Sequence, residues 1–146
     1  MSSPNFPVTI FHNPACGTSR NTVAMVREAG YDPEVIEYLK AGWTASQLLD
    51  LSARSGLSPR EMMRDKGTPA AELGLLDPAT PDEAILAAMV EHPILVNRPL
   101  VVTSRGVALC RPSERVFALL DHQPEQFTKE DGEVVVLGQA GAPKPA

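Results

Sequence analysis

The chain has 146 residues, of which 43% are hydrophobic and 21% are charged. This length suits a single domain, and the composition is that of a globular protein rather than a disordered one. Thirteen Lys and Arg residues against eighteen Asp and Glu residues give a formal net charge of −5. Because duplex binding leaves a basic footprint on a protein, we expect no nucleic acid among its partners.

The amino-terminal residues and the two cysteines indicate where the protein works. Residues 1–5 lack the basic region of a signal peptide, and the apolar run that follows them is too short for its hydrophobic region. No stretch approaches the roughly 18 apolar residues of a membrane span. Cys16 and Cys110 are too few for a disulfide framework. We therefore expect a cytoplasmic protein with free thiols and no membrane contact.

The first forty residues have a strand–helix–strand pattern. A β-rich run at residues 8–11 ends at Asn13-Pro14, and apolar residues then recur at helical spacing from Thr18 to Ala29, just before Gly30. A second apolar run, at residues 35–39, is typical of a strand. This order predicts two parallel strands joined by a right-handed helical crossover.

Residues 44–91 are predicted to form a cluster of short helices. Three segments, which begin at Thr44, Ser58 and Thr80, have the S/T-x-x-E/Q form of a capping box. The second and third also carry proline at the first helical position, where its missing N–H is harmless. A further helical turn is predicted at Thr68-Pro69.

The carboxyl-terminal part returns to a β pattern. Apolar runs at 94–96 and 100–103, with a turn at Arg105-Gly106 into residues 107–110, predict an antiparallel hairpin. A short helix is expected over 113–120, whereas 128–136 suits either a helix or a strand.

Together the elements predict an α/β fold. We expect a thioredoxin-like core with a mixed sheet (βαβ…ββα) and an inserted cluster of short helices. This core would form a single domain over residues 1–137. The Gly/Pro/Ala-rich residues 138–146 are expected to be a disordered tail.

Cys16 is the strongest candidate for a reactive residue. It lies between a predicted strand and a predicted helix, where backbone N–H groups converge at the positive end of the helix dipole and favour a thiolate. The same amides can bind an oxyanion, and Gly17 permits close approach of a ligand. A buried, inert cysteine is the alternative, but the polar flank with His12 and Arg20 favours a nucleophile.

The spacing around Cys16 excludes two common chemistries. The sequence Cys16-Gly17-Thr18-Ser19 is C-x-x-S, so no second local thiol can resolve a mixed disulfide. A Cys-x5-Arg phosphatase loop needs arginine six positions after the cysteine, where this chain has Thr22. A thiol that works alone requires an external reductant.

The segment from His12 to Thr22 resembles the active-site loop of the glutaredoxin-dependent arsenate reductases, the ArsC family of the thioredoxin-like fold. The resemblance extends over residues 8–136. Further segments that look like blocks of that family, in the same order, are residues 60–64, 92–99, 109–114 and 127–133.

By position, the resemblance implies that Cys16 is the nucleophile and that Arg64, Arg98 and Arg111 bind arsenate. Arginine suits this role because its planar guanidinium group binds tetrahedral oxyanions with two parallel hydrogen bonds. Simpler alternatives remain open: Arg64 could be a solvated helix residue, and Arg111 could merely precede a helix. The resemblance also implies a cis peptide bond at Pro99.

The roles of three other residues stay open on the sequence alone. His12 either tunes the Cys16 thiol or only caps the end of its strand. Ser19, like Gly17, Thr18 and Arg20, is a candidate supporting residue of the loop. Cys110 lies in an apolar run and is interpreted as a core residue rather than a resolving thiol.

The resemblance implies a reaction without metal or bound cofactor. Cys16 attacks arsenate to form a covalent adduct, glutathione reduces the arsenic, and glutaredoxin clears the resulting mixed disulfide. One alternative is a redox-responsive regulator of the Spx type, which binds RNA polymerase, although Ser19 breaks the C-x-x-C pattern of such switches. Another is an ArsC-like thiol protein with a different substrate.

Overall fold

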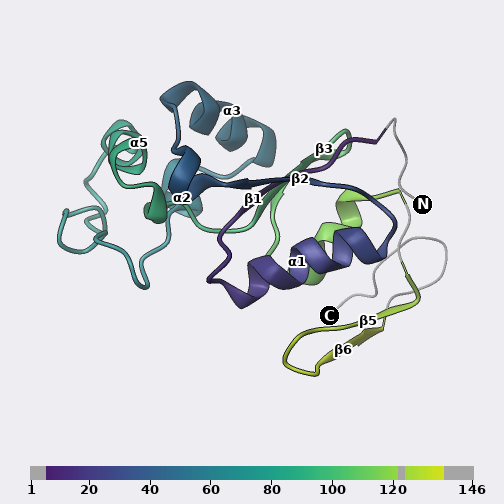
Figure 1. Ribbon diagram of the computed structural model, residues 1–146. Helices are drawn as coiled ribbons and strands as arrows, with labels where there is room; N and C mark the ends of the chain where they lie inside the picture. The colour runs from purple at the N-terminus through teal and green to yellow at the C-terminus, as the bar shows by residue number, and fades with distance from the viewer. Residues whose placement is uncertain (1–5, 122–123, 137–146) are drawn as a thin grey trace. The chain divides into compact units, whose positions relative to one another are not determined.

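The computed structural model describes residues 6–121 and 124–136 (Figure 1). Contacts divide the chain into two compact units. Unit 1 comprises Met1–Glu37 and Arg98–Ala146, and unit 2 comprises Tyr38–Asn97. The expected disordered tail, residues 138–146, lies outside the described residues, and the single domain over 1–137 stays a prediction.

Unit 1 contains a four-stranded mixed sheet in the order β2-β1-β3-β4. Its strands are β1 (Thr9–His12), β2 (Glu34–Glu37), β3 (Leu100–Thr103) and β4 (Gly106–Leu109). Strand β1 runs parallel to β2 and antiparallel to β3, and β3 pairs antiparallel with β4. Helix α1 (Gly17–Glu28) joins β1 to β2. The predicted βαβ crossover and the later hairpin are therefore confirmed, as is the thioredoxin-like fold class.

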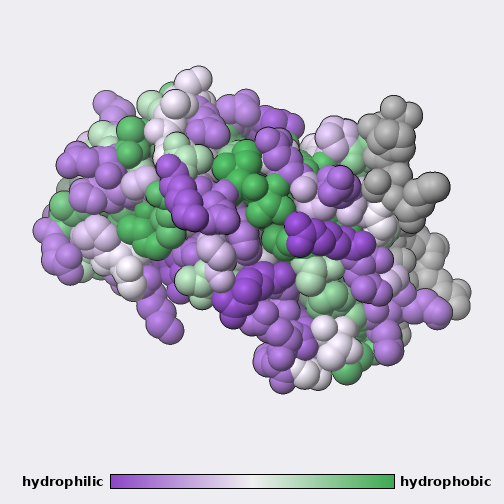
Figure 2. All heavy atoms as spheres, viewed as in Figure 1, coloured by the Kyte–Doolittle hydropathy of each residue, from purple (hydrophilic) through white to green (hydrophobic). Residues whose placement is uncertain are grey.

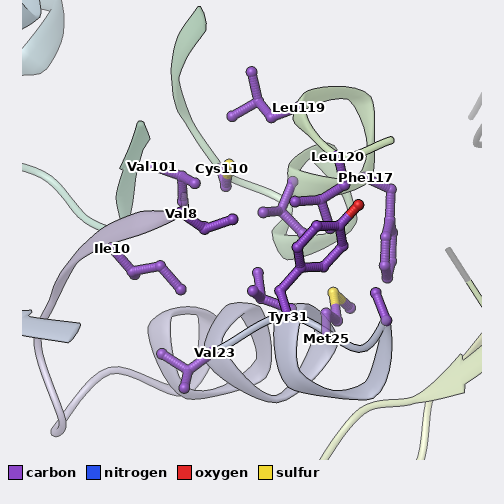
Figure 3. Packing of buried hydrophobic residues seen from close by; sticks show 13 residues of the cluster. Val8, Ile10, Val23, Met25, Tyr31, Val101, Cys110, Phe117, Leu119 and Leu120 are labelled. Atoms are coloured by element: carbon purple, nitrogen blue, oxygen red, sulfur yellow. The ribbon is translucent and has the colours of Figure 1, made fainter. Parts of the chain in front are cut away.

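The core of unit 1 lies between the sheet and two helical elements, α1 and the 3₁₀ helix η2 (Ser113–Leu119) (Figure 3). Ile10 of β1, Met25 of α1 and Phe117 of η2 are fully buried there. Burial of apolar side chains of this size supplies most of the free energy that fixes α1 against the strands. The amino-terminal end of α1 is therefore held at the end of β1.

Residues 128–136, for which the sequence suited either a helix or a strand, belong to a second sheet, which has two antiparallel strands. It consists of β5 (Gln126–Thr128) and β6 (Val134–Val136). Phe127 and Val135 pack against the core of unit 1, while Gly132 takes a positive φ of 95° in the connecting turn. The strand interpretation is correct because β-branched and aromatic residues can bury one face of this hairpin.

Unit 2 is a cluster of short helices, as predicted. They are α2 (Tyr38–Ala41), α3 (Ala45–Ser55), α4 (Pro59–Met62), α5 (Asp82–Glu91) and the 3₁₀ helix η1 (Pro93–Leu95). Two of the three expected capping boxes form with both reciprocal hydrogen bonds, at Thr44 and at Ser58. The third does not form, because Pro81 occupies the N-cap of α5 and the Thr80 hydroxyl donates to the Gly74 carbonyl instead.

Other boundaries differ from the predictions for identifiable reasons. The second strand ends at Glu37 rather than residue 39 because Tyr38 is fully buried and donates its hydroxyl to the Val96 carbonyl at 2.6 Å. The helical turn expected at Thr68-Pro69 is limited to one i→i+4 hydrogen bond, from the Leu73 N–H to the Pro69 carbonyl at 3.0 Å, and residues 66–80 otherwise form turns and bends. The Arg60 guanidinium stabilises them by donating to three backbone carbonyls, those of residues 75, 77 and 80.

Residues 94–96 are not a strand. Residues 93–95 form η1, and Val96 makes a single antiparallel bridge with Met63. Among the described residues, no helix is long and apolar enough to cross a membrane.

Candidate active site

The loop that carries Cys16 is fixed by its own backbone and by Asn13. The Asn13 side-chain oxygen accepts the Ala15 N–H at 2.9 Å, and the Asn13 carbonyl accepts the Cys16 N–H at 3.0 Å. Cys16 is the N-cap of α1, and the first turn of that helix contains no acidic residue. The positive end of the helix dipole therefore acts on the sulfur without a neutralising carboxylate in the same turn.

The thiol of Cys16 is more acidic than an ordinary cysteine. Burial raises the pKa of this thiol, but the Ser19 backbone N–H and the guanidinium groups of Arg98 and Arg111 lower it, with a net pKa of about 7. The Nη1 atom of Arg111 lies 3.7 Å from the Cys16 sulfur. A large share of the thiol is therefore a thiolate at neutral pH, which is the nucleophilic form.

Arg98 and Arg111 both precede a cis-proline. The cis bonds are Arg98-Pro99, as predicted, and Arg111-Pro112, which the sequence did not indicate. The Nη1 atom of Arg111 also donates to the Arg98 carbonyl at 2.9 Å. The Arg98 side chain reaches inward, since its Nε and Nη1 atoms are buried. Two guanidinium groups thus converge near one sulfur, an arrangement suited to a multiply charged oxyanion.

His12 is linked to the loop through Ser19. Its Nδ1 lies 2.5 Å from the Ser19 hydroxyl, which also accepts the Asn13 backbone N–H at 3.1 Å. Burial, together with the nearby Arg20, lowers the pKa of His12 although Glu37 opposes this shift. The imidazole is thus neutral at pH 7, and the fully buried Ser19 hydroxyl can donate to it. This geometry supports a role for His12 in holding the loop.

The Arg20 guanidinium is paired with a carboxylate and a backbone carbonyl rather than with the Cys16 sulfur. It binds both carboxylate oxygens of Glu130, with Nη2–Oε1 at 2.6 Å, and its Nη1 donates to the Pro14 carbonyl at 2.8 Å. Glu130 is also the nearest neighbour of Gly17, since a Cβ added to Gly17 would lie 3.4 Å from its Oε1, an ordinary van der Waals contact. Thr18 contributes a carbonyl that accepts the Thr22 hydroxyl.

Arg64 belongs to unit 2, whereas Cys16, Arg98 and Arg111 belong to unit 1. Its Nη1 donates to the Asn97 side-chain oxygen at 3.3 Å, and its Nε donates to the Lys66 carbonyl at 3.1 Å. Its role in binding an oxyanion stays a prediction from the sequence motif.

Cys110 lies in the core of unit 1, as the sequence predicted (Figure 3). It is fully buried, and burial raises the pKa of its thiol to about 12. The thiol of Cys110 is therefore far less acidic than that of Cys16. Only Cys16 has the environment of a nucleophile.

On the face shown in Figure 2, hydrophilic side chains lie over α1 and beside the β5–β6 hairpin. A pocket along α1 is lined by His12, Arg20, Val23, Ala24, Arg27 and Glu28. No group of three or more His, Cys, Asp or Glu side chains within residues 6–121 and 124–136 is arranged to hold a metal ion.

Comparisons with known proteins point to one family. The sequence matches the ArsC family over residues 11–119. An arsenate reductase of Synechocystis sp. is 57% identical over 130 residues, covering 88% of this chain and 93% of that protein. The arsenate reductase of Escherichia coli (strain K12) is 49% identical, covering 88% of this chain and 92% of its own length. A solved structure, the arsenate reductase from Vibrio cholerae, has a TM-score of 0.75 at 40% identity, covering 79% of this chain and 98% of that one.

Proposed function

The chain belongs to the ArsC family, and we propose that it reduces arsenate to arsenite through a covalent adduct on Cys16, with glutathione and glutaredoxin as electron donors. One observation carries the proposal more than any other. A thiol with a pKa of about 7 lies 3.7 Å from the Arg111 guanidinium and within the electrostatic reach of Arg98. A thiolate beside two arginines can bind an oxyanion and attack its central atom.

The first step is formation of a sulfur–arsenic bond. Arsenate is a tetrahedral oxyanion that carries substantial negative charge at neutral pH, and Arg98 and Arg111 offset its repulsion of the thiolate. Arg64 would add a third guanidinium. The Cys16 thiolate attacks arsenic, and one arsenate oxygen takes up protons and leaves as water. Arginine serves better than lysine because its fork binds two oxygens and stays protonated.

The second step transfers electrons. The thiolate of glutathione attacks the Cys16 sulfur, and the sulfur–arsenic bond breaks with its electron pair remaining on arsenic. Arsenic passes from the pentavalent to the trivalent state and leaves as arsenite, while the two sulfurs are oxidised to a mixed disulfide. Glutaredoxin then accepts the glutathione moiety by thiol–disulfide exchange and regenerates Cys16.

An external reductant fits the environment of both cysteines. Ser19 stands where a C-x-x-C protein has its second thiol, and its hydroxyl is committed to His12. Cys110 is fully buried with a raised pKa. These features favour a glutathione-dependent enzyme over a regulator that switches by forming its own disulfide. Dependence on reduced glutathione also favours the cytoplasm as its location.

The proposal is tested by arsenate-dependent NADPH oxidation in the presence of glutathione, glutathione reductase and glutaredoxin. Turnover should require arsenate, glutaredoxin and Cys16 together. The Cys110→Ala variant is the matched control and should retain the wild-type rate. If phosphate replaces arsenate, no NADPH should be consumed, since phosphorus is not reduced by thiols. Turnover that persists in Cys16→Ser, or wild-type protein with no arsenate-dependent turnover, would refute the proposal.

A further inference from the structure

The β5–β6 hairpin contacts the cysteine loop through one acidic residue. Both oxygens of Glu130, in the turn between the strands, accept hydrogen bonds from Arg20 of α1 at 2.6 to 3.2 Å. The backbone N–H of Glu130 donates to the Asn21 side-chain oxygen at 3.0 Å. Arg20 in turn donates to the Pro14 carbonyl at 2.8 Å, two residues before Cys16. Hydrogen bonds thus connect the turn of the hairpin, through Arg20, with the cysteine loop.

Lys129, the residue before Glu130 in the hairpin, contacts η2. The Lys129 ammonium lies 2.9 Å from Glu114 Oε1 and 3.3 Å from Glu133 Oε1. Only 10% of the Lys129 side chain is exposed. Glu114 is near the start of η2, three residues after Arg111. Two adjacent residues of opposite charge therefore attach the hairpin to both segments that flank the Cys16 sulfur.

We propose that the β5–β6 hairpin is a clamp on the active site, in which Glu130 orients Arg20 and thereby positions the Cys16 loop, while Lys129 holds the segment that carries Arg111. Glu130 and Arg20 are positioning residues, because neither contacts the sulfur. The hairpin itself is anchored in the core through Phe127 and Val135. The turn of the hairpin is therefore held in place by the core and can in turn hold the Cys16 loop in position.

The clamp also explains why Arg20 is not a third cation of the anion site in unit 1. The Arg20 guanidinium already donates hydrogen bonds to the Glu130 carboxylate and to the Pro14 carbonyl. An exposed ion pair contributes little to stability on its own. Its effect is geometric: it fixes the first turn of α1, whose Ser19 N–H stabilises the Cys16 thiolate.

Positioning and simple electrostatics predict opposite results when Glu130 is removed. Loss of a nearby negative charge alone leaves the pKa of Cys16 unchanged or lowers it. Loss of the clamp loosens the loop, weakens the Ser19 and Arg111 contacts with the thiolate, and raises the pKa. The sign of the shift therefore separates the two explanations.

The test measures the pH dependence of Cys16 alkylation by iodoacetamide, with the modified peptide identified by mass spectrometry. In Glu130→Ala the midpoint should rise by about half a unit or more, which corresponds to a roughly threefold loss of thiolate below the pKa. Glu130→Gln keeps an acceptor for Arg20 and should give a smaller rise. Glu125→Ala, which removes an exposed carboxylate just before β5, is the matched control and should match the wild type.

Coupling to Arg20 gives a second readout. In the Arg20→Ala background, adding Glu130→Ala should raise the midpoint no further, because the clamp is already open. A midpoint in Glu130→Ala that is unchanged or lowered would overturn the inference, as would a further rise in the double variant. The inference rests on the proposed role of Cys16 as nucleophile. Alkylation needs no arsenate, however, so a failure of the proposed reaction is distinguishable from a failure of the clamp.

Discussion

Arg111 directs one nitrogen at two groups of the active site: its Nη1 lies 3.7 Å from the Cys16 sulfur and donates to the Arg98 carbonyl at 2.9 Å. The side chain that stabilises the thiolate thus also holds the backbone of the second arginine. Substrate binding and activation of the nucleophile therefore depend on the same small set of contacts.

Replacement of Cys16 should abolish turnover. A serine hydroxyl at this position is far less acidic than the thiol and cannot form the disulfide that the electron transfer requires. We expect Cys16→Ser to lower kcat by at least about 10³-fold. Steady-state kinetics with the NADPH-coupled assay measure this loss. Retention of a tenth of the wild-type rate would remove Cys16 from the role of nucleophile.

Replacement of Arg111 or Arg98 by lysine should impair the enzyme although the charge is kept. Lysine cannot offer the paired donors of a guanidinium, and a lost charge-assisted hydrogen bond costs about 1.5–3 kcal/mol. This range corresponds to a fall in kcat/KM of roughly 10- to 100-fold. Arg115→Lys, which changes an exposed arginine of η2, is the control and should retain the wild-type kcat/KM. Equal kcat/KM values for all three variants and the wild type would show that neither arginine binds the substrate through its fork.

The reactivity of Cys16 should titrate near neutrality. Alkylation should rise with pH through a midpoint of about 7, whereas Cys110 should stay unmodified in the folded protein because its pKa is raised to about 12. Quantification of both peptides by mass spectrometry after timed alkylation measures the two rates. A midpoint for Cys16 near that of a free cysteine would contradict the stabilisation by Ser19, Arg98 and Arg111.

The lowered pKa of Cys16 also links stability to pH. A pKa below its unfolded value contributes stability that is present above the unfolded pKa and is lost as pH falls through the folded pKa. The free energy of unfolding of the wild type relative to Cys16→Ser should therefore increase as pH rises from about 7 to 9. Denaturant unfolding of both proteins at several pH values measures this difference. A difference that stays constant would mean that the thiolate is not stabilised by the fold.

A serine that caps a helix in unit 2 should contribute more to the free energy of unfolding than a serine on an exposed helix face. Ser58→Ala removes a hydroxyl that accepts the Glu61 N–H at 3.1 Å and should cost about 1 kcal/mol. Ser46→Ala, at an exposed position inside α3, should change the free energy of unfolding by less than about 0.5 kcal/mol. Equilibrium denaturation of the two variants makes the comparison, and equal effects would contradict the capping role.

Local patterns predicted much of the fold, and long-range contacts account for what they missed. The capping boxes at Thr44 and Ser58 form because every partner lies within three residues. The similar pattern at Thr80 fails because α5 has Pro81 as its N-cap, and the Thr80 hydroxyl is directed at the Gly74 carbonyl, six residues away. Periodicity at residues 128–136 could not decide between helix and strand, since the choice depends on packing of Phe127 and Val135 against the core.

In the active site, too, the sequence predicted local features but not long-range contacts. The position of Cys16 at a strand–helix junction could be predicted because it depends on adjacent residues. The ion pair between Arg20 and Glu130 joins residues that are 110 positions apart in the sequence, so no local sequence pattern could predict it. The acidic residue belonged to a recognisable motif, but its contact with the loop required the folded structure.

The covalent reaction on Cys16 can be followed by mass spectrometry of the protein after incubation with arsenate and glutathione in the absence of glutaredoxin. We expect one glutathione to become attached to Cys16 only when arsenate is present, and we expect glutaredoxin to remove it with recovery of the free thiol. Arsenite should appear in an amount equal to the modified protein. Arsenite formation without modification of Cys16, or glutathione attached to Cys16 equally well without arsenate, would contradict the proposed reaction.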